Sequence, residues 1–122
     1  MSPPHRVVLI VEDTILIRMG AVAFLEQAGF ETLEAGSADE AIEILIARPD
    51  VHLVVTDVNM PGTMDGIKLA HYIRARWPPV MLVVASGKAI VIETELPTGA
   101  RFFAKPYDGD ELVETITRML AV

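Results

Sequence analysis

The chain contains no cysteine, which rules out disulfide bonds and thiolate chemistry. Aromatic residues make up only 6% of it. Its apolar runs are all well short of the roughly 20 residues that a membrane-spanning helix needs. The first residues do not have the charged and apolar character of a secretory leader. We therefore expect a protein of the cytoplasm that does not insert into a membrane.

Basic residues are also scarce, because 10 Lys and Arg stand against 17 Asp and Glu, for a formal net charge of −7. They are dispersed along the chain, so direct binding to nucleic acid is not expected. Apolar residues are abundant, at 52% of the chain, and the mean hydropathy is +0.42. A chain of 122 residues with this composition can bury a core without disulfides or a structural metal. We expect a single domain over residues 1–122.

Four short apolar runs each lead directly into a polar or charged residue. The runs are rich in β-branched residues and do not alternate with polar ones, which is typical of strands buried on both faces of a parallel sheet. The carboxyl ends of parallel strands share one edge of the sheet, where ligands bind, so we expect the following residues to converge. The runs and the residues after them are Val7–Val11 with Glu12 and Asp13, Leu53–Thr56 with Asp57, Val80–Ala85 with Ser86, and Phe102–Ala104 with Lys105.

Helical patterns separate the strands and predict a doubly wound α/β fold. Right-handed crossovers and one change of winding direction give a five-stranded parallel sheet of order 2-1-3-4-5. The pattern between Ser86 and Lys105 is weak, so the fourth helix is expected to be short or irregular. The predicted strands are Arg6–Val11, Phe30–Ala35, His52–Thr56, Val80–Ala85 and Ala100–Ala104, and the other predicted helices are Thr14–Ala28, one that begins at Ser37, Gly66–Arg76, and one that Asp108 caps in a capping box with Glu111.

The first predicted helix carries two apolar stripes at helical spacing. We expect the first stripe to face the core. We hypothesise that the second stripe docks a partner helix beside the acidic pair, and the alternative is that neighbouring side chains half cover it. The first stripe is Ile17, Ala21, Phe24 and Ala28, and the second is Ile15, Met19 and Val22.

The polar residues at the predicted sheet edge suit phosphoryl transfer. Glu12, Asp13 and Asp57 would repel one another in one pocket, and a hard divalent cation such as Mg²⁺ relieves that repulsion. Lys105 adds a positive charge and Ser86 a hydroxyl donor, which completes the usual set for this chemistry. Asp57 is the candidate nucleophile, because it ends the central strand between the acidic pair and Ser86.

Five short motifs occur in order along the chain. They are V-E-D at Val11–Asp13, D-V-N-M-P-G at Asp57–Gly62, M-D-G at Met64–Gly66, A-S-G at Ala85–Gly87 and F-F-A-K-P-Y at Phe102–Tyr107. With these motifs the chain resembles a bacterial two-component response-regulator receiver domain, which has a flavodoxin-like fold, over essentially its whole length. The resemblance implies that Asp57 accepts a phosphoryl group from a sensor histidine kinase or a histidine phosphotransfer protein.

The resemblance also assigns roles around Asp57. Ser86 and Lys105 would bind the phosphoryl oxygens, and Phe102 would be the aromatic residue that swings inward on activation. The domain would then be a switch that controls partner binding, with no enzymatic activity beyond its own phosphorylation and dephosphorylation. Its downstream protein partner is open. The implied Mg²⁺ ligands are the side chains of Glu12, Asp13 and Asp57 and the backbone carbonyl of Asn59.

Three departures from the family pattern stand out. Glu12 replaces an aspartate that is common there, and Thr63 adds a residue to the loop after Asp57. The segment from Ser86 to Lys105 is a few residues short, so we do not expect strong dimerisation through that face and predict a monomer or weak dimer. The sequence after the last helix predicts no output domain, so we expect a chain that is either free-standing or a piece of a hybrid kinase or longer regulator.

Three other functions fit the sequence less well than the switch. A phosphoaspartate-type hydrolase favours a second acid two residues after its nucleophile, where this chain has Asn59. A mononucleotide binder needs a neutral phosphate loop after the first strand, where Glu12 and Asp13 would repel the phosphate. A domain that only binds partners would not need Asp57.

Overall fold

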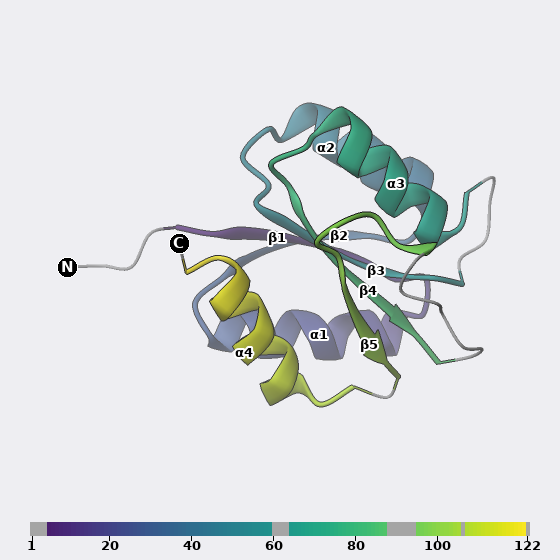
Figure 1. Ribbon diagram of the computed structural model, residues 1–122. Coiled ribbons are helices and arrows are strands. Elements are labelled where there is room, and N and C mark those ends of the chain that lie inside the picture. The colour runs from purple at the N-terminus through teal and green to yellow at the C-terminus, as the bar shows by residue number, and fades with distance from the viewer. Residues whose placement is uncertain (1–4, 60–63, 88–94, 106, 122) are drawn as a thin grey trace.

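Five parallel strands form the single sheet of this computed structural model, which describes residues 5–59, 64–87, 95–105 and 107–121 (Figure 1). The strand order is β2-β1-β3-β4-β5, as predicted. Each strand lies within one residue of its predicted bounds. The strands are β1 (Val7–Val11), β2 (Glu31–Ala35), β3 (Leu53–Asp57), β4 (Met81–Ser86) and β5 (Arg101–Ala104).

Two pairs of helices cover the two faces of the sheet (Figure 1). Helices α2 and α3 lie on one face, and α1 and α4 lie on the other. The predicted short or irregular helix between β4 and β5 falls largely on residues 88–94, which lie outside the described residues. The helices are α1 (Ile15–Gln27), α2 (Ala38–Ala47), α3 (Gly66–Arg76) and α4 (Gly109–Met119).

The central strands are buried on both faces, which explains their unbroken apolar sequences. Their side chains divide into two core clusters, one beneath α2 and α3 and the other beneath α1 and α4. Leu69 and Ile73 represent the first cluster, and Leu25 and Leu112 the second. No helix among the described residues is long and apolar enough to span a bilayer.

Side-chain caps fix the starts of three helices. The Ser37 hydroxyl accepts a hydrogen bond from the Glu40 amide at 3.2 Å, as the capping-box pattern predicts. Asp65 accepts one from the Lys68 amide at 2.9 Å. Asp108 caps α4 through the amide of Asp110 at 2.8 Å. These caps set where α2, α3 and α4 begin along the sheet edge.

The predicted core face of α1 is wrong at three of its four positions. Ile17 is 39% exposed and Phe24 43% exposed, and Ala28 is also exposed; only Ala21 is buried. The second buried position is Leu25. The helix is apolar around most of its circumference, so the sequence periodicity could not choose which face packs against the sheet.

Candidate functional site

The carboxyl ends of β1, β3, β4 and β5 bring the predicted site residues to one edge of the sheet. Val11 pairs with Thr56, so Glu12 and Asp57 follow side by side. Asp57 pairs with Ala85 on its other side, next to Ser86. The backbone amide of Lys105 donates to the carbonyl oxygen of Ser86 at 2.9 Å, which carries Lys105 to the same edge.

Three carboxylates cluster at this edge. Glu12, Asp13 and Asp57 each offer an oxygen atom, and these atoms all lie within 4.8 Å of one another. Glu12 and Asp57 are buried, whereas Asp13 is exposed and leaves the cluster open to solvent. A set of oxygen ligands with an open side fits Mg²⁺, which binds through a few carboxylates and retains water.

Lys105 completes the charge arrangement. Its Nζ donates a hydrogen bond to Oε1 of Glu12 and lies 3.3 Å from Oδ1 of Asp57. Burial lowers the pKa of Lys105, but the hydrogen bond to Glu12 and the charge of Asp57 outweigh burial, so its pKa is raised overall. Burial raises the pKa of Glu12, and the charge of Asp57 adds to this, against the lowering effect of Lys105. When Glu12, Asp57 and Lys105 are all charged, the single positive charge of Lys105 neutralises only one of the two carboxylates. Asp13 adds a further negative charge to the cluster.

The remaining predicted site residues occupy different environments. Ser86 is buried at the end of β4. Phe102 is half-buried and packs against the core cluster beneath α2 and α3. Asn59 is exposed two residues after Asp57. Ser86 thus lies at the acidic edge, whereas Phe102 borders the core.

Gly66 is a site residue that the sequence pattern did not identify. A Cβ atom on Gly66 would lie 1.9 Å from the carbonyl oxygen of Asp57, and the Gly66 amide donates to the carbonyl of Val58 at 2.9 Å. The start of α3 therefore presses against the backbone of Asp57, and only glycine fits there. The M-D-G motif places Gly66 at a helix start but gives no sign of this contact.

An apolar groove of about 530 Å³ adjoins the site. Its lining includes Leu16, Ile17 and Phe24 of α1 together with Lys105 and Tyr107. Burial raises the pKa of the Tyr107 hydroxyl at this position. The groove thus connects the exposed surface of α1 to the residue that binds Glu12 and Asp57.

The residues of the predicted docking stripe on α1 differ in their exposure to solvent. Ile15 is 61% exposed and Met19 is 58% exposed. Val22 is half-buried and packs against the core beneath α1 and α4, so neighbouring side chains cover this part of the stripe, as the alternative interpretation expects. Val22 lies on the same side of the helix as Leu25, whereas the exposed apolar surface continues through Leu16.

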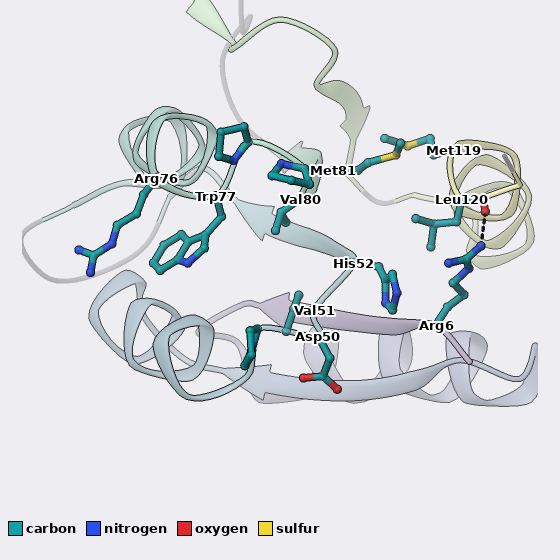
Figure 2. Close-up of a pocket in the computed structure, with 13 residues that line it drawn as sticks. Arg6, Asp50, Val51, His52, Arg76, Trp77, Val80, Met81, Met119 and Leu120 are labelled. Carbon is teal, nitrogen blue, oxygen red and sulfur yellow. Dashed lines mark hydrogen bonds between the residues drawn. The ribbon is translucent and has the colours of Figure 1, made fainter. Parts of the chain in front are cut away.

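A second hollow, of about 490 Å³, lies at the opposite ends of the strands (Figure 2). Its lining includes His52 before β3, Trp77 after α3 and Met81 at the start of β4. At one end of the hollow Arg6 donates to the carbonyl of Leu120 at 3.2 Å, which ties the residue after α4 to the residue before β1 (Figure 2). This hollow and the acidic cluster therefore lie at opposite ends of the strands, and none of the residues that line the hollow belongs to the cluster.

Comparisons with known proteins agree with this arrangement. The family model described as the response regulator receiver domain matches residues 8–117. The chain is 38% identical over 117 residues to the sensor kinase CckA of Brucella abortus, and 31% identical over 117 residues to the sporulation initiation phosphotransferase F of Bacillus subtilis. Each alignment covers 93% of this chain, but it spans 12% of the CckA kinase and 92% of the phosphotransferase.

Solved structures show the same likeness. The crystal structure of the receiver domain from the hybrid histidine kinase CckA superimposes with a TM-score of 0.81 at 31% identity, covering 93% of this chain and 98% of that one. A CheY-like receiver domain from Methanospirillum hungatei gives a TM-score of 0.86 at 26% identity, covering 97% of this chain and 95% of that one. With the family match, the sheet order and the acidic edge, these results establish that the chain belongs to the response regulator receiver domains, the phosphoacceptor modules of two-component signalling.

Proposed function

We propose that Asp57 is the phosphoacceptor of this receiver domain. The observation that supports it is the position of its carboxylate, which ends the central strand and faces both the acidic pair and the ammonium group of Lys105. In the reaction a carboxylate oxygen attacks phosphorus, the new O–P bond forms, and the bond from phosphorus to the donor breaks. The donor's leaving group takes up a proton.

Receiver domains generally use Mg²⁺, and the carboxylate cluster has the oxygen ligands for it. We assign Glu12, Asp13, Asp57 and the backbone carbonyl of Asn59 as its ligands. When bound, the ion would neutralise charge on the carboxylates and on the transferred phosphoryl group. The protein's contribution is to hold the carboxylates together at the end of the sheet, with α3 packed against the backbone of Asp57.

Two further residues act on the phosphoryl group in this proposal. Lys105 would move its hydrogen bonds from the carboxylates to a phosphoryl oxygen, and the Ser86 hydroxyl would donate to another. Inward movement of Ser86 would vacate space that Phe102 then occupies, which couples phosphorylation to the surface around β5. The half-buried position of Phe102 against the core is compatible with such a movement.

Receiver domains interact with histidine kinases or phosphotransfer proteins. We propose that a helix of such a donor packs on the exposed apolar surface of α1, formed by Ile15, Leu16 and Met19. The groove that runs from Leu16 to Lys105 supports this choice, because it would seat the donor beside Asp57. The predicted cytoplasmic location belongs to the same proposal, as does a single domain that acts as a monomer or weak dimer.

Intact-mass measurement after exposure to acetyl phosphate tests the proposal. Wild-type protein should gain one phosphoryl group with Mg²⁺ and little without it, and Asp57→Asn should gain none. Labelling that ignores Mg²⁺, or that survives Asp57→Asn, would contradict it. Continued release of inorganic phosphate from simple phosphate esters would instead favour a hydrolase.

A further inference from the structure

Arg18 contacts the backbone of the acidic pair and has no part in the mechanism proposed above. It lies in α1 and its side chain is only 20% exposed. One guanidinium nitrogen donates to the backbone carbonyl of Glu12 at 2.8 Å, and Nε donates to Oε1 of Glu34 at 3.0 Å. Arg18 therefore bridges the end of β1 to β2.

The carbonyl that Arg18 holds belongs to the peptide bond between Glu12 and Asp13. A peptide unit is planar, so fixing its oxygen also fixes the plane that carries the nitrogen and Cα of Asp13. The Glu12 amide donates to the carbonyl of Ala35 at 2.9 Å, which anchors the preceding unit. The backbone of the acidic pair is thus held on both sides of Glu12.

The two carboxylates of the pair differ in how they are held. The Glu12 carboxylate accepts hydrogen bonds from Lys105 and, at 3.1 Å, from the amide of Thr14. Asp13 is exposed, and no described residue donates to its carboxylate. The direction in which Asp13 points therefore depends on its backbone, and Arg18 is the side chain that fixes this backbone.

The chemistry of arginine suits this bridge. A guanidinium group donates in several fixed directions and stays charged, so it can bind a carbonyl and a carboxylate together. A lysine could keep the charge but not the same fork of hydrogen bonds.

We propose that Arg18 is a positioning residue for the metal site: it holds the Glu12–Asp13 peptide so that Asp13 faces Asp57. The inference rests on the proposed Mg²⁺ ligands. It predicts that loss of Arg18 weakens metal binding even though Arg18 binds Glu12 through the backbone carbonyl and not through the carboxylate. Residues that orient metal ligands change metal affinity by about 10- to 100-fold when they are removed.

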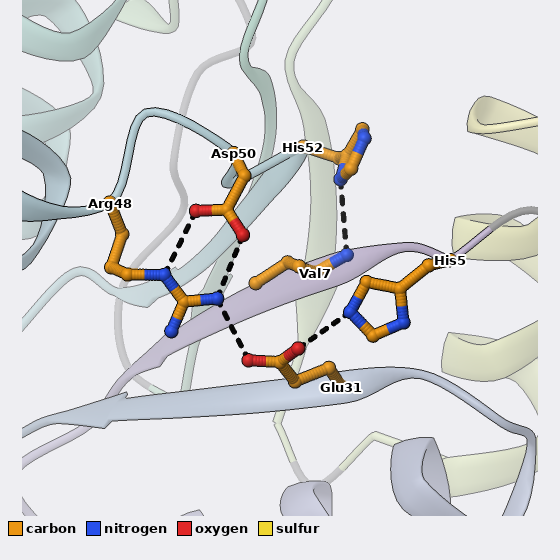
Figure 3. A network of polar contacts seen from close by, with 6 residues as sticks. All are labelled: His5, Val7, Glu31, Arg48, Asp50 and His52. Carbon is orange, nitrogen blue, oxygen red and sulfur yellow. Dashed lines mark hydrogen bonds and ion pairs between the residues drawn. The ribbon is translucent and has the colours of Figure 1, made fainter.

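Titration calorimetry with MgCl₂ on Arg18→Gln tests the inference. We expect about tenfold weaker Mg²⁺ binding, at the lower end of the range for such residues. The matched control is Arg48→Gln, because Arg48 also bridges two sheet-edge carboxylates, those of Glu31 and Asp50, at the opposite end of the strands (Figure 3). This control should bind Mg²⁺ like the wild type. In Arg18→Gln, the Mg²⁺ concentration that half-saturates phosphorylation by acetyl phosphate should rise by a similar factor.

Two further variants keep the test decisive if Arg18→Gln does not fold. Arg18→Lys should show a smaller loss of Mg²⁺ affinity, and Glu34→Gln, which leaves the contact with Glu12 in place, a smaller one still. Unchanged Mg²⁺ affinity in the folded Arg18 variants, or an equal loss in Arg48→Gln, would overturn the inference. If the wild type itself binds no Mg²⁺, the proposed function fails instead, so the two failures are distinguishable.

Discussion

The ammonium group of Lys105 lies between two buried carboxylates, donating to Oε1 of Glu12 and standing 3.3 Å from Oδ1 of Asp57. Among the described residues, Lys105 is the positive charge that contacts both of these groups. Both ends of the contact are largely removed from water, so the attraction is screened less than at the surface. The stability of the site and its chemistry therefore depend on the same residue.

Replacing Lys105 with Met should destabilise the metal-free protein. It leaves Glu12 and Asp57 buried without their counter-charge, and breaking such a pair costs about 3 kcal/mol at the lower end of measured values. Urea unfolding in EDTA measures this, and added Mg²⁺ should restore part of the loss. The exposed Lys68 provides the comparison, since Lys68→Met should change stability little. A Lys105→Met protein as stable as the wild type in EDTA would contradict this account of the site.

Replacing Gly66 with Ala should distort the backbone at Asp57. The new methyl group would lie 1.9 Å from the carbonyl oxygen of Asp57, so α3 or the end of β3 must move. We expect a loss of about 2 kcal/mol in the free energy of unfolding, in line with overpacked sites, together with slower phosphorylation by acetyl phosphate. Thermal unfolding and intact-mass time courses would measure the two effects.

Gly20 offers the matched control for Gly66. It lies within α1, and a Cβ atom there meets nothing within 4 Å. Gly20→Ala should therefore stabilise the protein by about 0.5–1 kcal/mol through helix propensity, with no change in phosphorylation rate. If both variants behave alike, the contact between Gly66 and Asp57 has no special role.

The ion-pair network around Arg48 predicts how stability changes with pH (Figure 3). Hydrogen bonds from Arg48 lower the pKa of Asp50 from 3.8 to about 2 and also lower the pKa of Glu31. A lowered folded-state pKa gives stability that is fully present above the unfolded pKa and is lost as pH falls through the folded value. The Arg48 contribution should therefore be constant near neutral pH and decline below about pH 4.

Urea unfolding of wild type and Arg48→Gln at several pH values would check this. The difference in unfolding free energy between the two proteins should shrink as pH falls from about 4 towards 2. Arg118→Gln, which removes an exposed pair within α4, serves as the reference for losing a surface arginine. A difference between wild type and Arg48→Gln that grows in acid would show that the sign is wrong.

The exposed surface of α1 gives a prediction about the phosphoryl donor. Ile15→Glu and Met19→Glu should each slow transfer from a phosphorylated histidine phosphotransfer protein about tenfold, which corresponds to about 1.4 kcal/mol of lost binding. Labelling by acetyl phosphate should not change, because it needs no docking. Val22→Ala should instead lower stability, since Val22 packs in the core. An unchanged rate of transfer from the protein donor in these two variants would show that α1 is not its docking surface.

The sequence predicted the sheet and the convergence of the site for a clear reason. Unbroken apolar runs have few possible places in a small α/β domain, and the order of crossovers then sets which strand ends are neighbours. Glu12 and Asp57 follow paired residues of β1 and β3 for this reason. The carboxylate cluster is a consequence of topology and could be predicted without coordinates.

Some contacts depend on the rotation of a helix about its axis or on how closely the helix approaches the sheet. These contacts could not be predicted in this way. Helix α1 has apolar residues on nearly every side, so periodicity placed Ile17 and Phe24 beside Ala21 in the core, whereas the residue buried with Ala21 is Leu25. The position of Arg18 within that apolar helix was a usable signal, because a charge there needs a partner. The approach of Gly66 to Asp57 depends on the packing of α3 and leaves no trace in the local sequence.

Locating the phosphoryl group tests the central claim most directly. Wild-type protein labelled by acetyl phosphate in Mg²⁺ can be reduced with borohydride, which converts a phosphorylated aspartate to homoserine, and then sequenced by tandem mass spectrometry. We predict homoserine at position 57 and unmodified carboxylates at Glu12 and Asp13. Homoserine at position 13 with an unmodified Asp57, or no conversion in a protein that has gained a phosphoryl group, would contradict the assignment of Asp57 as the acceptor.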